Sequence, residues 1–243
     1  MIGEINSLII LNFMIDKKQI TDVFFDLDHT LWDFEKNSAL TFERIFDKLN
    51  IYLNLDDFLK VYNGINHQYW KKYREDKISQ EELRSLRLIK TFQAIDFDFD
   101  PIKIDLISDL YILNLSSFSN LFEGAISLLE ELQVRYQLHV ITNGFEEVQH
   151  YKINNSGLNS YFEKIFTAEK VGYKKPHPII FKHALNQTNT LPKNSVMIGD
   201  SLEADILGAM NIGMHAIHFN SHNEPQHNHC PMVLNLHQIR CII

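Results

Sequence analysis

The stretch Asp22–Thr30 reads DVFFDLDHT and decides the fold. Its short apolar, aromatic-rich run breaks directly into acidic residues, which is how a buried parallel strand ends at a site. In extended backbone, residues two apart point to the same side, so the carboxylates of Asp26 and Asp28 would lie close together. The stretch therefore predicts a buried strand that ends in a pair of carboxylates.

Two neighbouring carboxylates at a strand end have a limited set of uses. Because they repel each other, one tends to stay protonated or both need a cation. Such a pair suits nucleophilic and acid–base chemistry, or the binding of a hard metal ion. Taken alone, Asp26–Thr30 favours the plainer interpretation of a turn with two solvated aspartates.

Similar apolar runs recur along the chain, and helical periodicity separates the later ones. The runs are Leu138–Thr142, Lys164–Thr167, Ser195–Gly199 and His215–Phe219. Helical spacing is found between them, as in Gly124–Val134 and Ile179–Leu185. This alternation predicts an α/β fold with a doubly wound parallel sheet. Ligands of such sheets bind at the carboxyl ends of the strands.

A long polar and aromatic segment interrupts the alternation after the first strand. Residues 33–118 carry apolar side chains at helical spacing and contain no run typical of a buried strand. We therefore expect a helical second domain over 33–118, inserted into a core domain of residues 19–32 and 119–243. Residues 1–18 are expected to form an N-terminal extension.

The composition of the 243 residues is that of a globular protein, with 45% hydrophobic and 22% charged residues. A formal net charge of −8 argues against a nucleic-acid polymer as partner. Only two cysteines occur, which excludes a disulfide framework and fits a reducing compartment. No stretch approaches the roughly 20 apolar residues that span a bilayer, and the N-terminus lacks the basic start of a signal peptide. We expect a cytoplasmic monomer or homodimer without a membrane partner.

Three more polar clusters follow predicted strands or open the next helix. They are Thr142–Gly144, Lys174–Pro176, and Gly199–Ser201 with Asp205. Each has an ordinary explanation as a strand-ending turn, a surface basic pair or a helix N-cap. Together they would place a hydroxyl, a lysine and further acids beside the first acidic pair, at one edge of the sheet. This combination predicts an active site.

The combination resembles the haloacid dehalogenase superfamily, specifically its phosphatase branch. The similarity runs from about Gln19 to Gln238 and includes FFDLDHTL, VITNG, GYKKPHPIIF and VMIGDSLEADILGA in that order. Within the superfamily the chain is most similar to the noncanonical pyrimidine nucleotidases, which are 5′-nucleotidases. The segments that carry this similarity are DLDHTLWDFEKNSALTF, YWKKYREDKISQEELRSLRL and GMHAIHFNSHNEP. The resemblance implies a Rossmann-like core and a magnesium-dependent phosphomonoester hydrolase for nucleotides.

The resemblance also implies catalytic roles for the motif residues. Asp26 would be the nucleophile that becomes an aspartyl-phosphate, and Asp28 would be the general acid and then the base. Thr142 and the backbone N–H of Asn143 would bind the phosphoryl oxygens. Lys175, rather than its neighbour directly before it, would neutralise charge on the phosphoaspartate.

A magnesium site is implied by the same motifs. The ligands would be the Asp26 carboxylate, the Asp28 backbone carbonyl and Asp200, with waters and a phosphate oxygen completing an octahedron. Asp205 would orient a metal-bound water or Lys175.

The inserted domain would be a cap that excludes water and shapes the pocket for the leaving group. Trp70 and Tyr73 lie in the middle of this segment and would be able to stack on a nucleobase. Packing within the cap is the plainer explanation for either aromatic residue taken singly.

The segment from His215 to Cys230 is rich in histidine, but its spacing matches no zinc pattern. Because His215 and His218 lie three apart on a predicted strand, they are expected to point to opposite faces. We predict a polar loop here, with a zinc site as the minor alternative.

Other functions remain open on the same residues. A phosphatase for small sugar phosphates or phosphoglycolate would use the same mechanism, and so would a phosphomutase. Asp28 argues against a 2-haloacid dehalogenase, because such enzymes need no acid for the leaving group and no magnesium. The presence together of Asp26, Asp28, Lys175 and Asp200 argues against an inactive binding protein.

Overall fold

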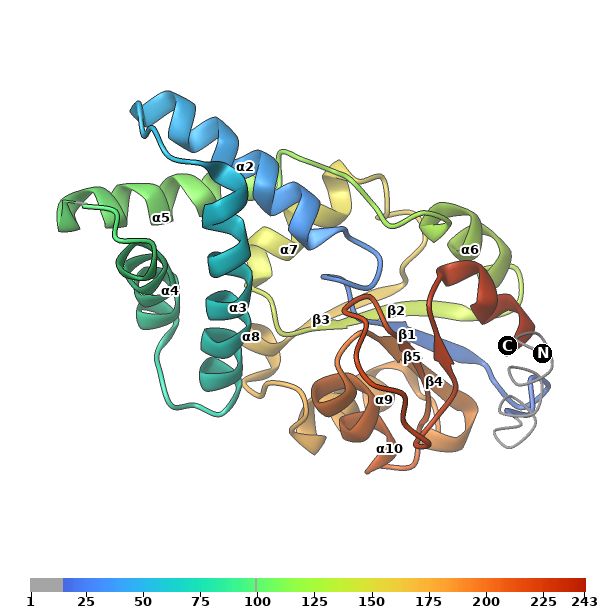
Figure 1. Ribbon diagram of the computed structural model, residues 1–243. Helices are drawn as coiled ribbons and strands as arrows, with labels where there is room; N and C mark the ends of the chain where they lie inside the picture. Colours follow the sequence, from blue (N-terminus) through green and yellow to red (C-terminus); the bar gives the residue numbers. More distant parts are fainter. Residues whose placement is uncertain (1–14, 99) are drawn as a thin grey trace. The chain divides into compact units, whose positions relative to one another are not determined.

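The computed structural model describes residues 15–98 and 100–243 (Figure 1). The described chain divides into two compact units. One unit holds the chain up to Asp33 together with Asn120–Ile243, and the other is Phe34–Ser119. Most of the expected N-terminal extension, residues 1–14, lies outside the described residues.

The first unit is built on a six-stranded sheet with the strand order β3-β2-β1-β4-β5-β6. All neighbouring strands run parallel, so the predicted α/β fold is confirmed. The strands are β1 (Asp22–Phe25), β2 (Gln137–Thr142), β3 (Lys164–Thr167), β4 (Ser195–Gly199), β5 (His215–Phe219) and β6 (Met232–Val233). The first five coincide with the predicted apolar runs, whereas β6 was not predicted.

Strand β1 lies in the middle of the sheet, between β2 and β4. Phe25, its last residue, is in register with Val140 and with Ile198. The backbone N–H of Asp26 continues this pairing, because it donates to the carbonyl of Ile198 at 2.8 Å. Residues that follow β1, β2 and β4 therefore emerge at the same edge of the sheet.

Helices cover both faces of this sheet. Figure 1 shows α6 (Ala125–Leu132) and α7 (Glu146–Asn155) on one face, and α9 (Pro178–Thr188) and α10 (Gly208–Met210) on the other. The chain passes from β1 to β2 and β3 on one side of the sheet, and then to β4, β5 and β6 on the other side. Because the crossover connections have the same handedness, this reversal places the helices of the two halves on opposite faces. The shorter helices of the unit are α8 (Ala168–Val171), η1 (Pro192–Asn194), η2 (Leu202–Leu207) and η3 (Leu236–Cys241).

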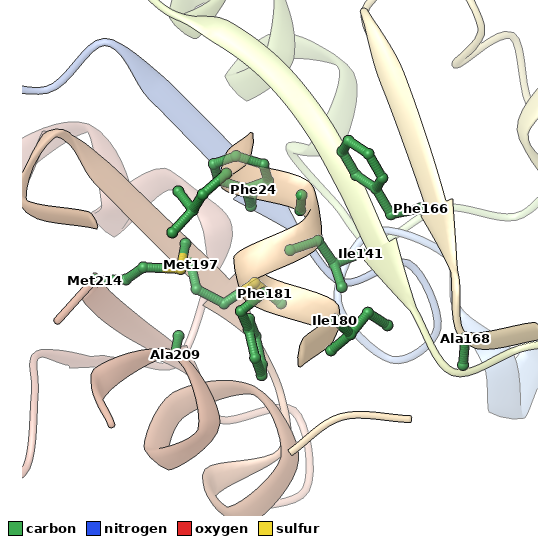
Figure 2. Close-up of a cluster of buried hydrophobic side chains, with 11 residues drawn as sticks. Phe24, Ile141, Phe166, Ala168, Ile180, Phe181, Met197, Ala209 and Met214 are labelled. Atoms are coloured by element: carbon green, nitrogen blue, oxygen red, sulfur yellow. The ribbon is translucent and has the colours of Figure 1, made fainter. Parts of the chain in front are cut away.

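A cluster of buried apolar side chains joins the sheet to α9 and α10 (Figure 2). Phe24 and Met197 contribute from neighbouring strands, and Phe181 contributes from α9. Phe181 also contacts Gly208, where an added Cβ would lie 2.8 Å from its ring and 3.1 Å from the Cα of Pro176. The packing of this layer thus reaches the backbone beside Lys175.

The second unit contains the helices α2 (Phe34–Leu49), α3 (Leu55–Arg74), α4 (Gln80–Ala94) and α5 (Pro101–Leu115). Helix α3 packs against α4, and α5 packs against α2 and α4. Its core is aromatic, with Phe42 4.9 Å from Phe58 and 4.7 Å from Tyr62 between ring centroids. None of the helices in the described ranges is long and apolar enough to cross a membrane.

We expect Gly208→Ala to destabilise the first unit by about 1–3 kcal/mol, because the new methyl group overpacks against Phe181 and Pro176. Gly64→Ala is the matched control. Gly64 lies inside α3, and apart from the helix's own backbone there is no heavy atom within 4 Å of its added Cβ, so this change should stabilise the chain by about 0.5–1 kcal/mol. Urea denaturation followed by circular dichroism measures both changes. A Gly208→Ala chain as stable as wild type would contradict the close packing.

Candidate active site

Four polar side chains meet at the carboxyl edge of the sheet. Asp26 follows β1, Asp200 follows β4, Asp205 lies in η2, and Lys175 precedes α9. Lys175 is 2% exposed, and its ammonium nitrogen contacts Asp26 Oδ1, lies 2.7 Å from Asp205 Oδ1 and donates to the carbonyl of Ile141 at 2.6 Å. Three segments far apart in the sequence therefore meet on one ammonium group.

The three carboxylates are crowded around this lysine. Asp26, Asp200 and Asp205 are buried, and each offers an oxygen atom within 4.8 Å of the others. Burial raises the pKa of Asp26 well above its ordinary value, and the nearby charges of Asp205 and Asp200 add to the effect, against the opposing influence of Lys175. Burial likewise raises the pKa of Asp205. A second cation would favour the ionised forms, and hard oxygen ligands of this kind fit Mg²⁺.

Lys175 keeps its charge in this setting. Burial alone would lower the pKa of its ammonium group, but Asp205 and Asp26 outweigh that effect and raise the pKa to about 12. The lysine is therefore a cation throughout the neutral range. Lys174, in contrast, is only partly buried.

Asp200 is held as a carboxylate by its neighbours. Thr30 donates to Oδ1 at 3.2 Å, and His222 Nε2 lies 3.1 Å from Oδ2. Burial opposes ionisation of Asp200, but the hydrogen bond from His222 and the nearby charge of His29 bring its pKa below the ordinary value. Asp200 thus differs from Asp26, although both lie at the same edge.

The histidine-rich segment consists of the end of β5 and the predicted loop after it, and its His218 has defined partners. His218 is fully buried on β5, and its Nε2 lies 2.8 Å from the backbone carbonyl of Asp200. Because that nitrogen faces a carbonyl it carries the hydrogen, so Nδ1 accepts from His227 Nε2 at 2.8 Å. These rings are hydrogen-bonded to each other in a way that supports Asp200. The predicted strand over His215–Phe219 and the loop after it are present, whereas the full burial of His218 and its contact with Asp200 were not predicted.

The two residues predicted to bind phosphoryl oxygens have well-defined partners. Thr142 is buried, and its Oγ1 accepts from the backbone N–H of Gly144 at 3.1 Å and from Gln149 Nε2 at 2.6 Å. The Asn143 side chain accepts from the N–H of Lys175 at 2.7 Å and donates to the carbonyl of Lys175 at 3.0 Å. Asn143 therefore fixes the backbone of Lys175 with its side chain, a contact that the sequence did not predict.

Helix α7 holds the second aspartate. Lys152 Nζ lies 2.5 Å from Asp28 Oδ1, and Gln149 Nε2 donates to Asp28 Oδ2 at 2.8 Å. Neither residue was predicted. The signal in the sequence is weak: two polar residues three apart share a helix face with Val148 and Ile153, and all four are buried.

The two aromatic residues predicted to hold a base lie on α3 of the second unit. Trp70 and Tyr73 are partly buried, and their rings meet edge to face at 5.7 Å between centroids. Their proposed contact with a nucleobase stays a prediction.

Comparison of sequences finds similarity to known hydrolases. The model of the haloacid dehalogenase-like hydrolase family matches residues 23–219. The HAD-hydrolase YfnB of Bacillus subtilis is 28% identical over 92% of this chain and 92% of its own length. The pyrimidine 5′-nucleotidase YjjG of Escherichia coli is 30% identical over 84% of this chain and 88% of its own. The glyceraldehyde 3-phosphate phosphatase of Methanothermobacter thermautotrophicus is also 30% identical, over 82% and 85% respectively.

Comparison of structures gives a consistent result. The crystal structure of YfnB bound to magnesium superposes with a TM-score of 0.82 at 27% identity, covering 92% of this chain and 98% of that chain. The similarity thus extends over both units of the chain rather than over the sheet alone.

We expect Lys175→Met and Asp26→Asn to change stability in opposite directions. Loss of the ammonium leaves buried carboxylates without their cation, which costs about 3–5 kcal/mol. Asp26→Asn removes a carboxylate whose ionised form burial disfavours, while Lys175 keeps Asp205, so the melting temperature should rise by roughly 2–4 °C. Differential scanning calorimetry in the presence of EDTA measures both.

Lys182→Met, at an exposed lysine of α9, is the control for the loss of a lysine, and its stability should stay within about 0.5 kcal/mol of wild type. A melting temperature that falls in Asp26→Asn as far as in Lys175→Met would show instead that the Asp26–Lys175 pair stabilises the metal-free chain.

Proposed function

Because this chain belongs to the haloacid dehalogenase-like hydrolase family, we propose that it is a magnesium-dependent phosphomonoester hydrolase. The observation that carries the proposal is the burial of Asp26 against Lys175, with Asp200 and Asp205 close by. A carboxylate held in place beside a permanent cation is well arranged to attack phosphorus and to tolerate the charge of a phosphoryl group. A relative named as a pyrimidine 5′-nucleotidase and another named as a phosphatase, each with 30% identity, support the same reaction class.

In the proposed reaction, one Asp26 oxygen bonds to phosphorus in line with the bond that breaks to the leaving oxygen. Asp28 donates a proton to that oxygen. Water then attacks the phosphoaspartate and gives its proton to Asp28, which releases phosphate and restores the Asp26 carboxylate. Lys175 stays charged through both steps and stabilises the phosphoryl oxygens.

The metal in this proposal would be held by the Asp26 carboxylate, the Asp28 backbone carbonyl and Asp200. Bound there, magnesium would supply positive charge that offsets the phosphate dianion. Three buried carboxylates around one lysine fit such an ion, because they carry more negative charge than the lysine compensates. Asp205 would orient Lys175, which it contacts at 2.7 Å. The magnesium bound in the crystal structure of YfnB supports the same choice of ion.

The unit Phe34–Ser119 would act as the cap that closes over the bound phosphate. Within it, Trp70 and Tyr73 are the residues proposed to contact the leaving group. The substrates would be pyrimidine nucleoside 5′-monophosphates, a choice supported by the similarity to YjjG. The similarity to a glyceraldehyde 3-phosphate phosphatase supports sugar phosphates as the alternative class.

The reaction class is tested with p-nitrophenyl phosphate. We expect magnesium-dependent release of p-nitrophenol, abolished by EDTA and restored by added magnesium. Asp26→Asn should lower kcat by at least about 10³-fold, because a neutral amide oxygen is a much weaker nucleophile than a carboxylate oxygen. Glu163→Gln, an exposed change before β3, is the control and should keep full activity. Hydrolysis that persists in Asp26→Asn, or with magnesium chelated, would contradict the mechanism.

The substrate class is tested with a panel of alkyl phosphates. We expect kcat/KM for UMP, dUMP or dTMP to exceed that for glyceraldehyde 3-phosphate and phosphoglycolate by about 10-fold or more, since stacking of a base contributes about 1–3 kcal/mol. Trp70→Ala should reduce the nucleotide values and leave the sugar phosphate values unchanged. Sugar phosphates that react faster than every nucleotide would refute the nucleotidase proposal and favour the alternative.

A further inference from the structure

The carboxylate of Asp28 is held by a helix that carries none of the expected catalytic residues. Lys152 Nζ lies 2.5 Å from Oδ1 and Gln149 Nε2 donates to Oδ2 at 2.8 Å, although these residues are separated from Asp28 by more than 120 positions. Both come from α7, which follows β2. Two side chains of α7, in the same unit, therefore hold the carboxylate of Asp28 in place.

Lys152 and Gln149 are buried at a cost that the packing of α7 does not explain. Lys152 is 2% exposed and Gln149 is fully buried, while side chains of these types are mostly found at protein surfaces. Burying an ammonium group is unfavourable unless it is paired. The Lys152 ammonium is compensated by the Asp28 carboxylate and by the ring of Trp32, whose centroid lies 4.3 Å away.

Trp32 and Gly144 shape the space that the side chains of Lys152 and Gln149 occupy. Trp32 is fully buried, and its backbone pairs with that of Asp28 and with that of Leu121, so the ring under Lys152 is fixed. An added Cβ on Gly144 would lie 2.9 Å from Gln149 Cγ. Gly144 therefore provides the space that Gln149 fills.

The two contacts on Asp28 are not equivalent. The contact of Lys152 with Oδ1 comes from an ionised donor, and such hydrogen bonds are about twice as strong as neutral ones. The contact of Gln149 with Oδ2 comes from a neutral amide, whose Nε2 also donates to Thr142 Oγ1 at 2.6 Å. Gln149 thus keeps a partner when Oδ2 turns away. Oδ1 is therefore the anchored oxygen, and Oδ2 is the one that is released more easily.

We infer that Lys152 and Gln149 are positioning residues for proton transfer by Asp28, with Lys152 anchoring Oδ1 so that Oδ2 faces the leaving group. The inference rests on the proposed phosphatase reaction. When the bond from phosphorus to the leaving oxygen breaks, Oδ2–H gives its proton to that oxygen. When water attacks the phosphoaspartate, Oδ2 takes the proton from the water. Gln149 holds Oδ2 between these steps.

The role is distinguished from simple structural support by the leaving group. Nitrophenolate leaves readily without a proton, whereas the alkoxide of an alkyl phosphate requires one. The value of kcat/KM reports the formation of the phosphoaspartate, in which the leaving group departs. Lys152→Met should therefore lower kcat/KM by about 10²-fold for the alkyl phosphate that the panel shows to react best, and by less than about 10-fold for p-nitrophenyl phosphate.

Matched variants complete the experiment. Lys152→Arg keeps a cation over Trp32 and should recover most of the loss on the alkyl phosphate. Lys170→Met removes an exposed lysine that lies 3.7 Å from Glu146, and should leave both rates unchanged. Lys152→Gln retains a hydrogen-bond donor and allows the same comparison of the two esters if the Met variant does not fold.

The outcomes separate this inference from the proposed function. Equal losses on the two esters in Lys152→Met, or no loss on either, would overturn the positioning role while the reaction class stands. A wild-type chain that hydrolyses neither ester with magnesium, or an Asp26→Asn variant with full activity, would overturn the reaction class and the positioning role together.

Discussion

The burial of the Lys175 ammonium among carboxylates is the constraint on which the rest of the site depends. A lysine at 2% exposure must be compensated almost completely, and the compensating groups come from β1, β2 and η2. The backbone around it is held equally tightly, since Asn143 bonds to both the N–H and the carbonyl of Lys175. Gly208 packs against Pro176 next to it. The close packing of Gly208 against Pro176 thus helps to hold the backbone of Lys175 in place.

The sequence predicted the sheet well because buried parallel strands carry a strong local signal. The apolar runs at β1, β2 and β4 are four to six residues long and are followed by polar residues. The local sequence pattern therefore predicts both where these strands lie and that they are buried. Strand β6 gave no such signal, because two residues define neither an apolar run nor an alternation. It exists because the edge of β5 was available for pairing.

The contacts that the sequence did not predict are side-chain contacts between distant segments. A lysine and a glutamine on a helix usually face solvent, and only the tertiary fold brings Lys152 and Gln149 of α7 to Asp28, which follows β1. His218 has the same explanation, because its partner is the backbone carbonyl of Asp200, which follows the neighbouring strand β4. Lys175 was distinguished from Lys174 by its place directly before Pro176 in the motif, and the burial that separates the two lysines could not be predicted from the sequence.

The formal charges at the sheet edge, including that of Lys152 on α7, are consistent with a divalent cation. Asp26, Asp28, Asp200 and Asp205 bring four negative charges to the sheet edge, and Lys175 and Lys152 bring two positive ones. The difference of two negative charges is what one divalent cation neutralises. Burial is the main cause of the raised pKa values of Asp26 and Asp205, and the charge of the neighbouring carboxylates raises them further. Lys152 contributes the cation that contacts Asp28, and with the proposed ion present a chain of net charge −8 can still bind a phosphate at this edge.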